Sequence, residues 1–119
     1  MTGHVYWILE VDIKDGEYAK FEALVAEIVA ATEANEPGAL NYEYSVSEDK
    51  KSCHILERYE DSAATMVHMS NFGKNFARRF MEVLTPKSVT LYGDPSEEVV
   101  KALAPMGVVK MTSVGGFSR

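Results

Sequence analysis

Apolar and polar residues alternate in the first segment of the chain, a pattern that indicates a strand with one buried face. Residues 4–13 are rich in β-forming types, and Asp15 and Gly16 end the run. From Glu17 the apolar spacing changes to that of a helix, which Pro37 and Gly38 end. The strand positions predicted to be buried are Val5, Trp7, Leu9, Val11 and Ile13, and those of the helix are Tyr18, Phe21, Leu24, Val25, Ile28 and Ala31.

Two further alternating runs lie in the middle of the chain, at residues 40–47 and 52–60. The polar residues 48–51 between them predict a hairpin turn. Asp61 is a suitable N-cap for a helical region that extends to about Leu84. Gly73 lies inside this region and predicts a kink or short break near residues 71–73.

The remaining chain predicts a smaller set of elements. Pro86 ends the second helical region, and residues 88–92 predict a short strand. Asp94 as N-cap, Pro95 at the first helical position and Glu97 at the third predict the start of a short helix. Residues 108–114 predict a last strand.

The order of these elements predicts an α+β fold of the ferredoxin-like βαββαβ type, with a C-terminal helix and strand as an extension. No repeat, low-complexity stretch or linker interrupts the chain. We therefore expect a single domain over residues 1–119, with a core at about 4–92 and an extension at about 94–119.

Composition and charge narrow the possible partners. The chain has 12 lysines and arginines against 18 acidic residues, a formal net charge of −6, which disfavours binding to nucleic acid. Its single cysteine, Cys53, cannot form an internal disulfide and fits a reducing, cytoplasmic location. No targeting signal is evident, and no apolar run approaches the roughly 20 residues of a membrane span, so we expect no membrane association.

Several common kinds of chemistry leave no signature in this sequence. There is no glycine-rich phosphate loop, dinucleotide fingerprint or nucleophile elbow. The histidines, His4, His54 and His68, are far apart and lack partners at the spacings of metal ligands, so we expect no metal. Cys53 has no neighbouring base that would activate it as a nucleophile.

Aromatic residues with a few polar groups form the remaining candidate site. Tyr42 and Tyr44 share one face of a predicted strand, and the adjacent strand places Glu57 and Tyr59 on its own face. His68 borders the apolar stripe of the second helix, on the same flank as Asn75 and Arg79 if that helix is continuous. The stripe consists of Met66, Met69, Phe72, Phe76 and Phe80.

Each of these features also has a structural interpretation. A stripe of Met and Phe at helical spacing is more often core than pocket, and a lone histidine beside it is more often structural. A carboxylate on an apolar face costs several kcal/mol unless it is paired. Glu57 therefore either pairs with Arg58, Arg78, Arg79 or a partner chain, or it has a raised pKa and a catalytic role.

Three strings in the sequence resemble the antibiotic biosynthesis monooxygenase family. They are Glu36-Pro37-Gly38 followed by Tyr42-Glu43, then Glu57-Arg58-Tyr59, then Ala63-Ala64 with His68 on the following helix. The resemblance covers about residues 4–92, and the segment from Asp94 to Arg119 looks like the C-terminal extension of some members.

The resemblance implies a ferredoxin-like protomer that pairs into a dimeric α/β barrel. It also implies oxidation of phenolic or quinol-type polycyclic compounds by molecular oxygen, without a metal, a flavin or another cofactor. By this resemblance the catalytic residues are His68, Glu57 and Tyr59. The expected substrate-binding residues are Tyr42, Tyr44, Met69, Phe72 and Phe76.

Two departures from the family pattern matter for the chemistry. The string Ser70-Asn71-Phe72 lacks the second histidine that many members carry, and Tyr59 replaces an indole donor. The first strand has no asparagine, which argues against the haem-degrading relatives. The alternative to an oxygenase is a non-catalytic dimeric module that binds an apolar metabolite.

A homodimer is expected on independent grounds. Two helices cover one face of a four-stranded sheet, and an uncovered apolar face usually finds a partner. The last predicted strand, residues 108–114, could pair with a second copy and so protect an exposed sheet edge.

Overall fold

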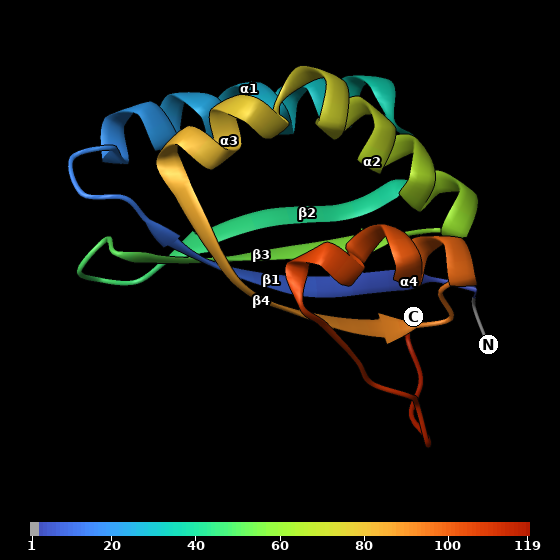
Figure 1. The fold of residues 1–119 in the computed structure, drawn as a ribbon. Coiled ribbons are helices and arrows are strands. Elements are labelled where there is room, and N and C mark those ends of the chain that lie inside the picture. The colour runs from blue at the N-terminus through green and yellow to red at the C-terminus, as the bar shows by residue number, and fades with distance from the viewer. Residues whose placement is uncertain (1–2) are drawn as a thin grey trace.

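A mainly antiparallel sheet forms the base of the fold (Figure 1). The computed structural model describes residues 3–119, and within this range the sheet has five strands in the order β2-β3-β1-β4-β5. Only the pairing of β4 with β5 is parallel. The strands are β1 (Val5–Ile13), β2 (Ala39–Val46), β3 (Ser52–Tyr59), β4 (Leu84–Gly93) and β5 (Val108–Lys110).

Three helices lie on one face of this sheet, as Figure 1 shows: α1 (Tyr18–Asn35), α2 (Ser62–Asn75) and α3 (Ala77–Val83). A short helix α4 (Glu97–Leu103) continues into a 3-10 turn (Ala104–Met106), which contacts β4. The α+β, ferredoxin-like prediction is thereby confirmed, including the C-terminal helix and strand. None of the helices within residues 3–119 has the length and hydrophobicity needed to cross a membrane.

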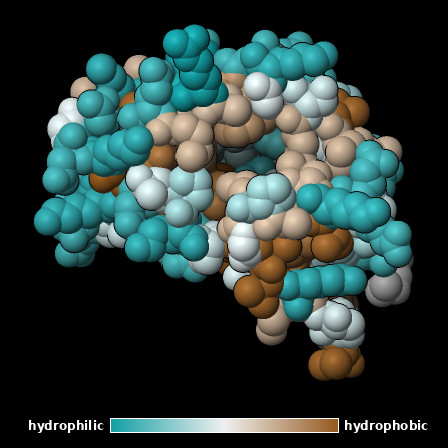
Figure 2. Space-filling model, viewed as in Figure 1, coloured by the Kyte–Doolittle hydropathy of each residue, from teal (hydrophilic) through white to brown (hydrophobic). Residues whose placement is uncertain are grey.

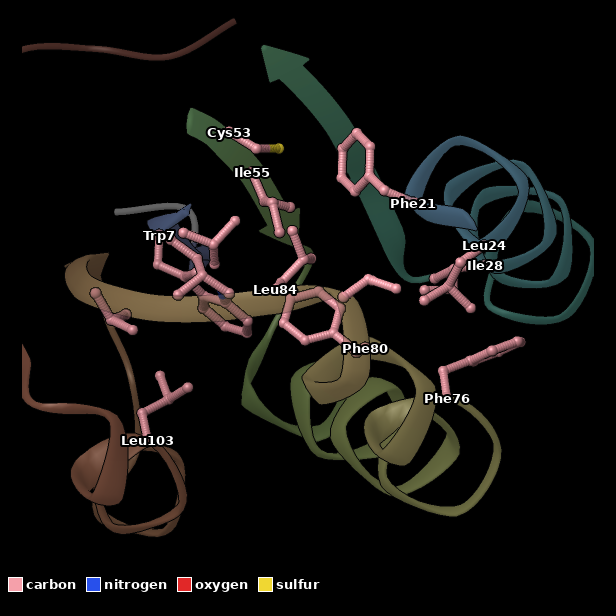
Figure 3. Close-up of a cluster of buried hydrophobic side chains, with 14 of the residues drawn as sticks. Trp7, Phe21, Leu24, Ile28, Cys53, Ile55, Phe76, Phe80, Leu84 and Leu103 are labelled. Atoms are coloured by element: carbon pink, nitrogen blue, oxygen red, sulfur yellow. The ribbon is translucent and has the colours of Figure 1, made fainter. Parts of the chain in front are cut away.

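The core lies between the sheet and the three helices. Every second residue of β1 is buried, from Val5 to Ile13, as the alternation predicts. Figure 3 shows Phe80 pointing toward Leu84 and the sheet, while Phe21, Leu24 and Ile28 approach from α1. Full burial of each such side chain contributes roughly 1.5–3 kcal/mol, so the sheet and helices stabilise each other through this layer.

The second helical region breaks later than the sequence predicts. Gly73 remains helical, and the break falls at Phe76, whose φ of −132° separates α2 from α3. Figure 3 shows the Phe76 side chain directed toward α1, whereas Phe80 points into the core above the sheet. One continuous helix would place these two residues on one stripe, so the break gives the two rings different neighbours.

Strand β4 is longer than predicted because it tolerates a proline. It begins at Leu84 and includes Pro86, where the β1–β4 register shifts between Glu10 and Val11. On its other side β4 pairs with β5 only at Val89 to Leu91. Pro86 has no backbone N–H to donate, but no strand is paired beside it on that side, so no hydrogen bond between strands is lost there.

The C-terminal extension differs in detail from the prediction. Ser96, and not Asp94, is the N-cap of α4, with its hydroxyl oxygen accepting from the Val99 amide at 3.3 Å. The last strand ends at Lys110 instead of Val114, and it pairs with β4 of its own chain.

The other face of the sheet carries no helix within residues 3–119. Tyr6 and Tyr92 stack there with ring centroids 5.4 Å apart, and Ile8 pairs with Leu56, which is 39% exposed. The C-terminal segment passes along this side, where an Arg58 Nη1 donates to Ser118 Oγ at 3.4 Å (Figure 1). Most of this face is therefore open.

Close packing explains the glycine of the Glu-Pro-Gly string. A Cβ on Gly38 would lie 2.6 Å from Ala64 Cβ and 3.2 Å from Glu60 Oε1. We expect Gly38→Ala to lower the free energy of unfolding by about 1–3 kcal/mol, measured by chemical denaturation. Gly73→Ala is the control, because an added Cβ there meets no heavy atom within 4 Å, and it should stabilise α2 by roughly 0.5–1 kcal/mol. Equal effects of the two substitutions would contradict this account.

Candidate functional site

A cavity of about 300 Å³ lies between the sheet and helices α2 and α3. Its walls are mostly apolar and include Leu9, Met69, Phe72, Phe80, Leu103 and Met106. Its polar side chains are Tyr42, Tyr44, Glu57 and His68, with Trp7 beside them. Figure 2 shows a hollow with a hydrophobic rim and hydrophilic surface at its depth, between the helical layer and α4.

Glu57 is the centre of the polar part of this cavity. The residue is only 4% exposed, although its side chain is a carboxylate. Trp7 Nε1 donates a hydrogen bond to Glu57 Oε2 at 2.9 Å, and the Tyr59 hydroxyl donates to Oε1 at 2.7 Å. Strands β1 and β3 are adjacent, and Trp7 and Glu57 are direct partners in their register, which brings the indole to the carboxylate.

Glu57 has no arginine partner among the described residues, so pairing with Arg58, Arg78 or Arg79 is not found, while pairing with a partner chain stays a prediction. Arg79 forms an exposed bidentate pair with Glu27 instead, at 2.7 and 2.9 Å. Burial raises the pKa of Glu57, while the charge of His68 and the hydrogen bonds from Tyr59 and Trp7 oppose this effect. The raised pKa of the second alternative is therefore found, while the catalytic role of Glu57 stays a prediction.

His68 lies between two buried carboxylates. Its Nδ1 is 3.0 Å from Glu36 Oε1, and its Nε2 is 3.4 Å from Glu57 Oε1. Asn71 Nδ2 donates to the other oxygen of Glu36 at 3.3 Å. The rings of Tyr42 and Tyr59 each lie 5.1 Å from the imidazole, so aromatic side chains fill the space around it.

Tyr42 and Tyr44 form a pair of hydrogen-bonded hydroxyl groups 2.7 Å apart. Burial, together with the nearby charge of Glu57, raises the pKa of both phenols, so they remain protonated. Because one O–H group is used between them, the second is free to donate a hydrogen bond to a ligand in the cavity.

The structure brings most of the predicted site residues together. Tyr42, Tyr44, Glu57, His68, Met69 and Phe72 line the cavity. Tyr59 does not line the cavity, but it contacts two residues that do, Glu57 and His68. Phe76 also lies outside the lining, contrary to the expectation, because the helix break turns it toward α1 and beneath Arg79.

Sequence reasoning missed two residues of the site. Trp7 was assigned to the core, although a buried indole N–H needs an acceptor, and that requirement could have indicated a polar partner. Glu36 was noted only as part of a motif. Its position at the end of α1, before Pro37, carries no sign that it reaches a histidine 32 residues later.

The arrangement is suited to proton transfer and not to metal binding. No group of three potential ligands could hold a metal ion within residues 3–119. Glu36 and Glu57 lie on opposite nitrogens of the His68 ring, so the three groups do not converge on one point. Cys53 is also unsuitable as a nucleophile, because burial raises its pKa to about 11.

The raised pKa of Glu57 predicts a pH-dependent stability. Unfolded chains ionise this group near the ordinary value of 4.5, whereas the folded protein holds its proton to higher pH, so stability falls as the pH rises through that window. Glu57→Gln removes the ionisation. In urea denaturation between about pH 5 and about pH 8, we expect this variant to lose less stability than the wild-type protein does.

The control for this experiment is Glu27→Gln. Its exposed carboxyl group has a pKa below the ordinary value because it bonds to Arg79, so it does not titrate in this range. This variant should keep the wild-type pH dependence. Parallel curves for Glu57→Gln and wild type would refute the assignment of a raised pKa to Glu57.

Comparison with solved structures supports the fold over nearly the whole chain. MupZ from Pseudomonas fluorescens is 24% identical with a TM-score of 0.82, and the match covers 98% of this chain and 94% of that one. Rv0793 from Mycobacterium tuberculosis is 23% identical with a TM-score of 0.66, covering 79% and 97%. SnoaB, a cofactor-independent oxygenase from Streptomyces nogalater, is 20% identical with a TM-score of 0.65, covering 76% and 92%.

These identities are low, so the solved structures establish the shared fold only. No curated protein sequence matches the chain significantly. The sequence profile described as "Antibiotic biosynthesis monooxygenase" matches residues 5–73, which is more than half of the chain and includes β1, β2, β3 and His68. The chain therefore belongs to the antibiotic biosynthesis monooxygenase family.

Proposed function

We propose that this protein is a cofactor-independent monooxygenase that oxidises a small quinol or phenolic polycyclic compound with molecular oxygen. The observation that carries the proposal is a buried pair of proton acceptors, Glu57 and His68, on the wall of a mostly apolar cavity. Family membership supports it, and so does the similarity in fold to an oxygenase described as cofactor-independent.

The reaction begins with removal of a proton from a substrate hydroxyl group. The resulting phenolate is electron-rich and reacts with oxygen, and the peroxide formed collapses to a quinone and water. One oxygen atom enters the product and the other leaves as water. All the electrons come from the substrate, so the reaction needs no external reductant.

The protein's own groups would perform three tasks in this reaction. Glu57 and His68 accept the substrate proton. The free O–H of the Tyr42–Tyr44 pair donates to a substrate oxygen on which negative charge develops. The apolar walls exclude water, which protects the reactive intermediate.

The cavity also limits the substrate. An apolar cavity of about 150 Å³ accommodates benzene, so about 300 Å³ suits a compound of roughly two or three fused rings. Its lining contains two acidic or proton-accepting groups and no lysine or arginine within the described residues. We therefore expect a neutral phenol to be preferred to a carboxylated one.

One observation favours the alternative, a non-catalytic module that binds an apolar metabolite. The polar groups behind the cavity are hydrogen-bonded to each other, as they would be in a purely structural network. This alternative predicts tight binding of a flat aromatic ligand and no product, with or without oxygen.

Oxygen uptake with 1,4-naphthohydroquinone or anthrone, corrected for the uncatalysed reaction, distinguishes the two. We expect His68→Gln to lower kcat/KM by about 10²–10⁴-fold, the usual contribution of a general base. His54→Gln is the matched control, since His54 does not line the cavity and its side chain is 58% exposed, and it should keep wild-type activity. If the wild-type protein binds these compounds but consumes no oxygen, the oxygenase proposal is wrong.

A homodimer formed through the open face of the sheet completes this proposal. Buried there without hydrogen-bond partners among the described residues are Asn41 Oδ1 and Arg58 Nε, which are cross-strand neighbours. The apolar side chains of Tyr6, Ile8 and Leu56 lie on the same face. A second copy would cover these apolar groups and supply polar partners.

Leu56→Lys tests the dimer by placing a charge in the centre of the open face. We expect sedimentation at micromolar concentration to give a dimer for the wild-type protein and a monomer for this variant. Val67→Lys on α2, at a position 52% exposed, introduces the same charge elsewhere and should remain dimeric. A wild-type monomer would contradict the proposal.

A further inference from the structure

We propose that Glu36 is a positioning residue that fixes the His68 ring with its proton on Nδ1, so that His68 Nε2 and Glu57 together accept the proton of the substrate. The catalytic part of this inference rests on the proposed function. The position of the proton on the ring does not, and it can be measured without a substrate.

The contacts of Glu36 leave its side chain little freedom. Glu36 is the residue that ends α1, where its backbone N–H bonds to Thr32 O at 2.9 Å. It is 7% exposed, and Asn71 Nδ2, which can only donate, holds its Oε2 at 3.3 Å. Its Oε1 lies 3.0 Å from His68 Nδ1.

A carboxylate only accepts hydrogen bonds, so the nitrogen that faces Glu36 must carry a proton. In a neutral imidazole the other nitrogen, Nε2, is then unprotonated. This nitrogen faces Glu57 Oε1 across 3.4 Å. Histidines in functional sites are commonly oriented in this way by a carboxylate on the second ring nitrogen.

A count of protons shows what this orientation achieves. When the site accepts one proton, this proton resides either on His68 Nε2 or on Glu57 Oε1. The two arrangements differ only in which of these two atoms, 3.4 Å apart, carries the proton. The O–H bond of the substrate breaks and one N–H or O–H bond forms in this pair. That proton later leaves with the water produced when the peroxide collapses.

Glu57 is prepared for the same role from its other side. Trp7 and Tyr59 both donate to it, at 2.9 and 2.7 Å, and so hold its carboxylate in one orientation. If the His68 proton moved from Nδ1 to Nε2, Nε2–H would donate to Glu57 and the pair would lose its free acceptor nitrogen. Glu36 prevents this exchange.

Glu36→Gln tests the inference with little change of shape. Asn71 can donate to the new amide oxygen, which turns the amide NH₂ group toward His68 Nδ1 and requires that nitrogen to become an acceptor. We therefore expect the ring proton to move to Nε2. The readout is the ¹⁵N spectrum of the imidazoles in mildly alkaline buffer, with His68 assigned by comparison with His68→Gln.

The kinetic expectation is specific to a positioning residue. Glu36→Gln should lower kcat by about 10–100-fold, the loss that commonly follows removal of the carboxylate partner of a metal-bound histidine, while KM changes little. Glu27→Gln is the matched control, because it removes an exposed carboxylate from the helical surface. It should alter neither the His68 spectrum nor kcat.

Two results would overturn the inference. One is a wild-type spectrum in which His68 Nδ1 is unprotonated, a measurement that requires no variant to fold. The other is a folded Glu36→Gln protein in which the ring proton stays on Nδ1. If the wild-type protein consumes no oxygen, the proposed function fails, while the spectrum still decides the role of Glu36.

Discussion

A carboxylate in the interior of a protein must be surrounded by hydrogen-bond donors, and Glu57 imposes this requirement on the whole molecule. Its donors, Trp7 and Tyr59, come from β1 and β3. His68 of α2 faces it at 3.4 Å, and a second carboxylate, Glu36 at the end of α1, contacts the other nitrogen of that ring. The elements of the fold thus converge on one group. Removing Trp7 or Tyr59 as a donor would leave the buried carboxylate partly unpaired, which commonly costs several kcal/mol.

Burial of Glu57 has opposite effects on its strength as a base and on the stability of the folded protein. Burial raises the pKa of Glu57 and makes it a better proton acceptor, but the same burial lowers the stability of the folded state at neutral pH. The aliphatic layer between β1 and α1, with Leu24 and Ile28 in it, offsets that loss.

Local sequence patterns were sufficient for most of the fold. Alternation placed β1 and the β2–β3 hairpin, and Asp61 marked the start of α2, where its side chain accepts from the Ala64 amide. The patterns failed where distant contacts decide. The helix breaks at Phe76 and not near Gly73, and Phe76 and Phe80 consequently pack against different neighbours. The candidate site could likewise be predicted only in part. Glu57 and His68 can be recognised from the sequence because they are polar residues on apolar faces. The Trp7–Glu57 hydrogen bond depends on strand register, and the His68–Glu36 contact depends on how the helices pack, so neither could be predicted.

The cavity is built by two separable parts of the chain. Its proton-accepting groups and their partners lie between Trp7 and Asn71, almost the span of the family profile, but one wall comes from Leu103, Pro105 and Met106 in the C-terminal extension. Changes in that extension alter the shape offered to a ligand without touching a donor of Glu57. On the proposed function, exchanging this short terminal segment would change the range of substrates that fit the cavity while leaving Glu57, His68 and their hydrogen-bond partners in place.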